Sequence, residues 1–391
     1  MLAAPAPGVG APPRVTAPQA IVVEPVTGDV VFRRDADRPR PIASATKLMT
    51  ALVVLERVRL DEVFEATDYA GAPIESKLGL EAGEPMAVRD LLRALLLASA
   101  NDAAETVAVG TAGSVPAFVE LMNERARALG LRQTRFANPI GLDEPGNHSS
   151  AADLAELTLR LRRIPFFDRT VDLGRVRLGS GRRGRVVVNR NDLIRSEPIV
   201  DGVKTGRTEQ AGYVLVGSAT RGGVTVVSVV LGDSSEAARD ADTLALLLYG
   251  LGRFRSVRVM RPGQVLRSAA VKFREEDRVG LVPARALTRV LGRGERAAVA
   301  FDAPRVLEGP LAAGAPVGSV TVRVRGRVIA RIPLLTAARV PEVGLGERAL
   351  DLLLKPGTLA LIGILAGAVL ALVLLRRRRG AAARRIETES A

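Results

Sequence analysis

The stretch AGYVLVGSATRGGVTVVSVVLG, residues 211–232, contains two apolar runs rich in β-branched residues. The pattern predicts two strands, 211–219 and 224–232. Near the N-terminus IVVEPVTGDVVF, residues 21–32, predicts two more short strands around a Thr-Gly-Asp turn. Helical patterns lie between these ends. We therefore expect an α/β or α+β layer fold, in which both chain ends build one sheet and a helical cluster packs against it.

The helical patterns have recognisable starts and ends. Ser44 stands at or near the start of a helix through residues 48–58, and Ser114 caps another through 116–129, which ends at Gly130. Three further helices are predicted at 88–100, 150–164 and 236–251. One short strand is predicted at 185–189.

The length of 391 residues suits two domains with appendages. After about residue 253 the sequence changes to short β-like runs separated by Gly and Pro, which predicts a small all-β domain. The expected segments are a flexible N-terminal lead (1–18), a main domain (19–253), the β-rich domain (254–342), a linker (343–358), a transmembrane helix (359–375) and a basic cytoplasmic tail (376–391).

The transmembrane prediction rests on LALIGILAGAVLALVLL, residues 359–375, which has no charged or polar side chain. As a helix this segment would span about 26 Å, close to the thickness of a bilayer's hydrocarbon core. The arginines at 376–379 should stay cytoplasmic, so the domains before the helix should face outward. Residues 1–18 show no basic n-region or apolar h-region, and we expect a signal peptide upstream of Met1.

The composition excludes several kinds of site. The chain has no cysteine and one histidine, His148, so thiolate zinc sites, redox pairs and cysteine nucleophiles are excluded. We expect His148 to be a surface residue of its Gly/Asn/Ser-rich loop, with no metal and no cofactor. The net charge of +14 could suggest nucleic acid, but aromatic residues make up 3% and no nucleic-acid module is recognisable. An envelope protein in anionic surroundings is the simpler interpretation.

One lysine stands out in PIASATKLMT, residues 41–50, because only five of the 56 basic residues are lysine. Arginine stays protonated in proteins, whereas a desolvated lysine can lose its proton and act as a base. Lys47 follows Ser44 by three residues, so both would share a helix face near the helix N-terminus. The pair predicts a nucleophile with its base; the alternative is a capped helix with a solvated lysine.

Two further clusters could carry chemistry. In ASANDAAE, Ser99 and Asn101 follow an apolar helix and could project into one cleft, although both residue types also simply favour helix ends. In VDGVKTGRTEQAGYVLV, Lys204, Thr205 and Gly206 could supply positive charge, a hydroxyl and close backbone approach, although the segment could also be an ordinary turn into a strand.

Together, S-x-x-K, S-x-N and K-T-G in this order are the signature of serine penicillin-recognising enzymes. The sequence resembles the D-alanyl-D-alanine carboxypeptidases, the low-molecular-mass penicillin-binding proteins, over roughly residues 15–255 and more loosely over the β-rich domain. Four further segments resemble sequences of this family and occur in the same order as in its members. They are TGDVVF, SANDAAE, NPIGLDEPGNHSSAADLAEL and VDGVKTGRTEQAGYVLVGSA. The resemblance implies a serine β-lactamase/DD-peptidase-like domain with an antiparallel sheet and a helical cluster.

The resemblance implies roles at the reacting end of the site. Ser44 would be the nucleophile and Lys47 the base that takes its proton. Ser99 would pass that proton to the departing D-alanine, while Asn101 would hold the peptide. The backbone N–H groups of Ser44 and Arg207 would form the oxyanion hole.

Other residues would bind the substrate's terminal carboxylate. Lys204 and Thr205 would hold it, with Gly206 allowing close approach. Arg239 matches a position where family members also carry an arginine near the carboxylate; a solvated helix face is the alternative for this residue.

The implied activity is removal of the terminal D-alanine from peptidoglycan pentapeptide stems through an acyl-enzyme, which limits cross-linking. β-Lactam antibiotics would be covalent inhibitors. The middle motif reads S-A-N rather than S-D-N, and no deacylating glutamate stands out, which favours a carboxypeptidase over a β-lactamase. DD-endopeptidase or transpeptidase activity on the same scaffold, and a catalytically silent peptidoglycan-binding protein, are the alternatives.

Overall fold

The computed structural model describes residues 10–389, which form two compact units. The first unit runs to Val257 and includes Val290–Gly294, and the second contains Arg258–Arg289 and the chain from Glu295 onward. Each unit has its own hydrophobic core.

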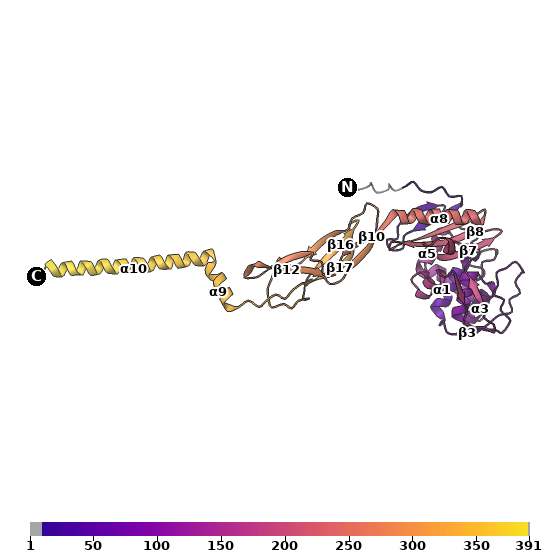
Figure 1. Ribbon diagram of the computed structural model, residues 1–391, viewed down its shortest axis with the longest axis horizontal. Coiled ribbons are helices and arrows are strands. Elements are labelled where there is room, and N and C mark those ends of the chain that lie inside the picture. The colour runs from indigo at the N-terminus through magenta and orange to yellow at the C-terminus, as the bar shows by residue number, and fades with distance from the viewer. Residues whose placement is uncertain (1–9, 390–391) are drawn as a thin grey trace. The chain divides into compact units, whose positions relative to one another are not determined.

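The first unit is built on a five-stranded antiparallel sheet with the order β2-β1-β9-β8-β7. Figure 1 labels two of these strands, β7 and β8. Its strands are β1 (Gln19–Val23), β2 (Val30–Arg34), β7 (Val200–Thr208), β8 (Gly212–Arg221) and β9 (Val224–Asp233). Strand β1 pairs with β9 along its length. The prediction of a sheet assembled from both chain ends is therefore confirmed.

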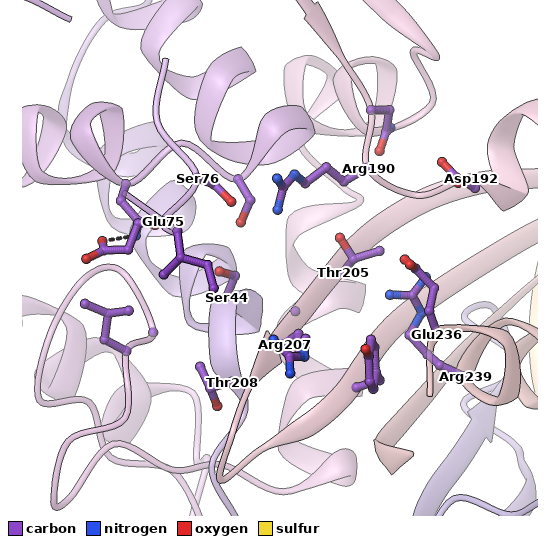
Figure 2. A pocket seen from close by; sticks show the side chains of 18 of the residues that line it. Ser44, Glu75, Ser76, Arg190, Asp192, Thr205, Arg207, Thr208, Glu236 and Arg239 are labelled. Atoms are coloured by element: carbon purple, nitrogen blue, oxygen red, sulfur yellow. Dashed lines mark hydrogen bonds and ion pairs between the residues drawn. The ribbon is translucent and has the colours of Figure 1, made fainter. Parts of the chain in front are cut away.

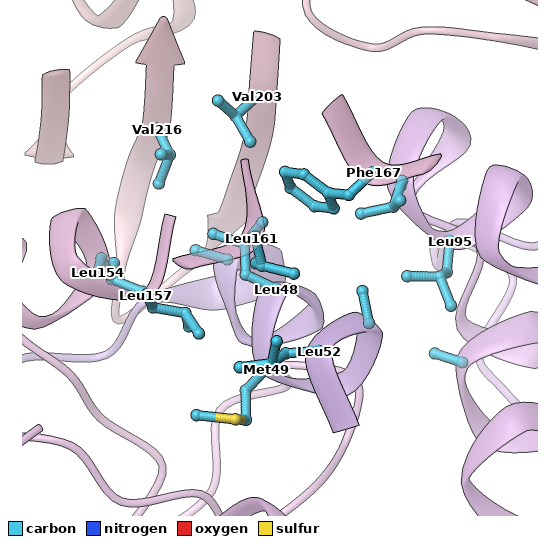
Figure 3. Packing of buried hydrophobic residues seen from close by; sticks show 14 of the residues in the cluster. Leu48, Met49, Leu52, Leu95, Leu154, Leu157, Leu161, Phe167, Val203 and Val216 are labelled. Atoms are coloured by element: carbon cyan, nitrogen blue, oxygen red, sulfur yellow. The ribbon is translucent and has the colours of Figure 1, made fainter. Parts of the chain in front are cut away.

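The alternating strand residues give the sheet two buried faces. On one face Leu246 and Leu247 of α8 (Glu236–Arg253) pack against residues such as Leu215. On the other face α1 (Lys47–Arg57) and α5 (Ala151–Leu161) cover the sheet. Figure 3 shows this second core, where leucines of both helices lie below strand residues Val203 and Val216.

Four further helices form the cluster on the α1 side. They are α2 (Val88–Arg93), α3 (Asn101–Ala112), α4 (Val115–Ala128) and α6 (Pro165–Val171), with two short hairpins, β3 (Val63–Glu65) with β4 (Pro85–Ala87) and β5 (Arg175–Arg177) with β6 (Val186–Val188). The short helix α7 (Leu193–Ser196) instead packs Leu193 into the core on the α8 side. The helix predicted over 88–100 extends to Ala98, because α2 continues without a gap into a wider π-helical turn, η2 (Ala94–Ala98). The next residue, Ser99, has a left-handed backbone and ends the helix.

The predicted flexible lead is wrong for its last residues. Val15 and Ala17 are buried, and the backbone N–H of Ala17 donates to the Asp242 carboxylate at 2.8 Å. The Thr16 hydroxyl oxygen lies 3.0 Å from a carboxylate oxygen of Asp233 and 3.0 Å from one of Asp242, within hydrogen-bonding distance of both. The carboxylates of Asp233 in β9 and Asp242 in α8 thus bind residues 16 and 17, although the proline-rich sequence around them suggested a loose tail. Residues 1–9 of the predicted lead lie outside the described residues.

The second unit contains a six-stranded sheet with the order β14-β16-β17-β12-β11-β15. The strands are β11 (Arg267–Val271), β12 (Arg274–Pro283), β14 (Ala298–Asp302), β15 (Val306–Leu307), β16 (Pro316–Val324) and β17 (Arg327–Thr336). Strands β10 (Phe254–Met260) and β13 (Leu287–Gly292) form a separate pair. The predicted all-β domain is confirmed, although Val290–Gly294 groups with the first unit because Val290 packs into that unit's core.

The segment expected as a linker contains a helix, α9 (Leu345–Leu354), which precedes α10 (Pro356–Glu389). Within α10, Pro356–Arg377 is long and apolar enough to cross a membrane, with a mean hydropathy of 2.8, and none of it is buried against protein. The predicted span at 359–375 lies inside this segment. Of the expected tail, residues 376–389 continue the helix and 390–391 lie outside the described residues.

Candidate active site

Ser44 lies in a short 3₁₀ helix, η1 (Ala43–Thr46), that leads directly into α1. Lys47 begins α1, and its Nζ lies 3.1 Å from Ser44 Oγ. The amine also donates to Asn101 Oδ1 at 2.7 Å and to the Ile140 carbonyl at 2.6 Å. The lysine is 0% exposed, so the alternative of a solvated lysine beside a helix cap is wrong.

Burial lowers the pKa of Lys47 well below its usual value, because the ammonium form loses its hydration. The positive charges of Lys204 and Arg190 lower this pKa further, whereas Glu75 and Asp102 raise it. The net effect favours the neutral amine, which is the form that can accept a proton.

The turn after η2 brings a second hydroxyl to the site. Ser99 has φ 61°, in the left-handed region, and is 3% exposed. Its Oγ has no hydrogen-bond partner within residues 10–389. Asn101 begins α3, and its carboxamide is held at both ends, since Oδ1 accepts from Lys47 and Nδ2 donates to Glu75 at 2.7 Å.

Strand β7 carries the third motif. Lys204 is 1% exposed, and its Nζ donates to the Thr205 carbonyl at 2.9 Å. Burial, together with the charges of Arg190 and Arg239, lowers the pKa of Lys204 to about 7. Gly206 lies against η1 so closely that a Cβ there would lie 2.9 Å from the Ser44 nitrogen.

The three motifs meet at one cleft of about 980 Å³. In Figure 2 Ser44 lies between Glu75 on one side and the strand that bears Thr205 and Arg207 on the other. The predicted residues that line the cleft are Ser44, Ser99, Asn101, Thr205, Gly206, Arg207 and Arg239. The two predicted lysines are buried behind this wall, where the charge of Lys204 acts on Lys47.

Arg239 projects from α8 into this cleft and is 3% exposed, so the alternative of a solvated helix face is wrong. Its guanidinium forms ion pairs with Glu236 at 2.9 Å and Asp240 at 2.8 Å. Figure 2 shows Arg239 and Glu236 together at the end of the cleft away from Glu75.

Several charged residues that line the cleft were not predicted from the sequence, and two of them, Glu75 and Arg190, act on the buried Lys47. Arg190 lowers the pKa of both lysines, but among 51 arginines nothing in the sequence singles it out. Glu75 lies in a loop between β3 and β4, without the periodic pattern that helped to place the motif residues.

Comparison with known protein families identifies the family of the chain. The model for peptidase family S11, described as D-alanyl-D-alanine carboxypeptidase, matches residues 7–235. The chain belongs to family S11. A second model, the C-terminal domain of penicillin-binding protein 5, matches residues 254–342, which include the six-stranded sheet. The S11 assignment makes the protein a serine-type carboxypeptidase of the D-alanyl-D-alanine class.

Individual S11 relatives agree over most of the chain. D-alanyl-D-alanine carboxypeptidase DacA of Escherichia coli strain K12 is 32% identical over 362 residues, 88% of each chain. The crystal structure of penicillin-binding protein 5 from Haemophilus influenzae is 29% identical with a TM-score of 0.62, and covers 85% of this chain and 100% of that one. The Streptomyces K15 DD-transpeptidase structure is 32% identical with a TM-score of 0.59, and covers 62% and 99%, respectively.

Proposed function

We propose that the protein removes the terminal D-alanine from peptidoglycan stem pentapeptides, with Ser44 as the nucleophile of an acyl-enzyme. The observation that carries the proposal is the contact between Ser44 Oγ and the buried Nζ of Lys47, 3.1 Å apart at the wall of an open cleft. A hydroxyl within hydrogen-bonding distance of a neutral amine is an activated nucleophile.

The hydrogen bonds of Lys47 support its role as the base. A neutral amine has two N–H bonds and one lone pair. The acceptors at Asn101 Oδ1 and the Ile140 carbonyl take the two N–H bonds, so the lone pair is directed at Ser44 Oγ. Ser44 would attack the peptide carbonyl as its proton passes to Lys47, and the tetrahedral oxyanion would be held by the backbone N–H groups of Ser44 and Arg207.

The other residues of the cleft complete the reaction. The unpartnered Oγ of Ser99 could receive the proton from Lys47 and pass it to the departing D-alanine nitrogen. Positive charge at Lys204 and Arg239, with the Thr205 hydroxyl, suits the substrate's terminal carboxylate. Water would then hydrolyse the acyl-enzyme, and a β-lactam would acylate Ser44 in the same way.

The apolar part of α10 supports attachment to a membrane. We place both folded units on the outer face, where peptidoglycan lies, and the arginines after residue 375 in the cytoplasm.

A labelling experiment tests the proposed function. The full-length protein in detergent is incubated with a fluorescent penicillin, and the adduct is located by mass spectrometry of its peptides. We expect the label on the peptide that carries Ser44, and release of D-alanine from a D-Ala-D-Ala peptide. Label on another residue would contradict the nucleophile. Transfer of the acyl group to an added amine, without formation of the free peptide acid that is one D-alanine shorter, would contradict the carboxypeptidase assignment.

We expect Glu236→Gln to strengthen substrate binding. Glu236 is 61% exposed and competes with a substrate carboxylate for Arg239, with which it forms an ion pair. Exposed ion pairs contribute about 0.2–1 kcal/mol, so KM for a D-Ala-D-Ala peptide should fall about 1.4- to 5-fold while kcat changes little. An unchanged or higher KM would show that Arg239 does not bind the carboxylate.

A further inference from the structure

We propose that Glu75 is a positioning residue that orients the Asn101 carboxamide and, through it, the lone pair of Lys47. The inference rests on the proposed role of Lys47 as the base. It assigns a function to a loop residue outside the three motifs. It also explains why both ends of the Asn101 side chain are bound within the protein.

The Glu75 carboxylate is fixed by several donors. Its Oε2 accepts hydrogen bonds from Asn101 Nδ2, at 2.7 Å, and from the Tyr69 hydroxyl, and its Oε1 accepts from the Ala72 N–H at 2.8 Å. Burial opposes the charge, but the hydrogen bonds from Tyr69 and Asn101 outweigh it, so the pKa of Glu75 lies below its usual value. Glu75 therefore remains an ionised acceptor across the pH range in which lysine would titrate.

The loop that carries Glu75 is attached to the same turn as Asn101. The Asn101 N–H donates to the Ser76 carbonyl at 2.7 Å. The neighbouring Asp102 carboxylate accepts from the N–H groups of Leu78 and Gly79 at 2.9 and 2.8 Å. These hydrogen bonds fix the loop of Glu75 to the start of α3 and keep the Glu75 carboxylate beside the Asn101 carboxamide.

The hydrogen-bonding chemistry of the Glu75 carboxylate favours one of the two orientations of the Asn101 carboxamide. An ionised carboxylate only accepts hydrogen bonds, so it selects the NH₂ end of the Asn101 carboxamide and turns Oδ1 toward Lys47. With the opposite orientation, the NH₂ group would face Nζ and compete with the Ser44 hydroxyl for the lone pair. The carboxylate thus determines which group the amine can deprotonate.

Glu75 also acts through its charge. The charged groups that act on Lys47 are Lys204 and Arg190, which lower its pKa, and Glu75 and Asp102, which raise it. Removing the Glu75 charge should therefore lower the pKa of Lys47 further and make the neutral amine available at a more acidic pH.

The test compares Glu75→Gln and Glu75→Ala by the pH dependence of the second-order rate of acylation by a fluorescent penicillin. Glutamine keeps an acceptor for Asn101 but removes the charge. For Glu75→Gln, we expect the acid limb of the pH–rate profile to move to lower pH by at least about 0.5 unit. The plateau of the acylation rate should stay within about threefold of wild type. Alanine also loses the acceptor, and its plateau should fall about ten- to hundredfold.

Glu156→Gln, at an exposed position of α5, removes the same charge and is the matched control, with an expected profile equal to wild type. Melting temperatures are recorded for every variant, and Glu75→Leu, which also lacks the acceptor, replaces the alanine variant if that variant does not fold. With normal wild-type acylation at Ser44, a Glu75→Ala plateau equal to wild type would overturn the positioning role, and coincident wild-type and Glu75→Gln profiles would overturn the effect of its charge. Absence of wild-type acylation at Ser44 would instead contradict the proposed function.

Discussion

Lys47→Arg is expected to reduce acylation by penicillin and D-alanine release by about 10³-fold or more, the upper part of the range for a general base. The substitution keeps a basic side chain of similar length, but guanidinium does not give up its proton at any working pH. The position is 0% exposed and its amine already satisfies two acceptors. Raising the pH should therefore not restore the rate.

Acylation rates from pH 5 to 10 check this prediction, together with the melting temperature. Lys272→Arg is the matched control, because Lys272 belongs to the second unit and has a side chain that is 42% exposed and forms an ion pair with Glu308. This control should retain wild-type activity. A folded Lys47→Arg protein that acylates within tenfold of wild type would show that another group takes the Ser44 proton.

Gly206→Ala is expected to reduce acylation by about 10²-fold, the effect of losing one oxyanion-hole donor. The added methyl group would lie 2.9 Å from the Ser44 nitrogen and 3.0 Å from Ala43 Cβ. Because both neighbours belong to the tight η1 turn, either this turn or strand β7 must move. Either movement displaces the donor N–H groups from the carbonyl of the bound substrate.

The second-order rate of acylation measures the effect, and Gly252→Ala serves as the control. Gly252 lies in α8, where an added Cβ meets nothing within 4 Å, so this variant should be as active as wild type. A Gly206→Ala protein with the wild-type rate would place the oxyanion donors elsewhere in the cleft.

Much of the fold could be predicted because its signals are local. The β-branched runs at 211–232 and 21–32 gave strands near the right positions, and apolar runs of helical period gave the helices over them. The predicted lysines could be found because lysine is rare in this chain. Lys47 and Lys204, from distant parts of the sequence, are both buried and electrostatically coupled.

The features that were missed depend on tertiary contacts. The order in the residues just before β1 comes from carboxylates at 233 and 242, which are more than 200 residues away in sequence. The Ile140 carbonyl that binds Lys47 is a backbone group, which no side-chain pattern reveals. Glu75 and Arg190 have ordinary side chains in loops, and only the folded cleft distinguishes them.

The pairing of β1 with β9 has a consequence for biosynthesis. The nucleophile leaves the ribosome about 160 residues before the KTG strand, and the central sheet cannot close until β9 has also been made. A chain that ends before β9 therefore lacks the strand that joins β1 to β8, and its catalytic cleft is incomplete. Covalent capture of a fluorescent antibiotic would then report that maturation of the whole domain is complete, and could be used to follow it in time.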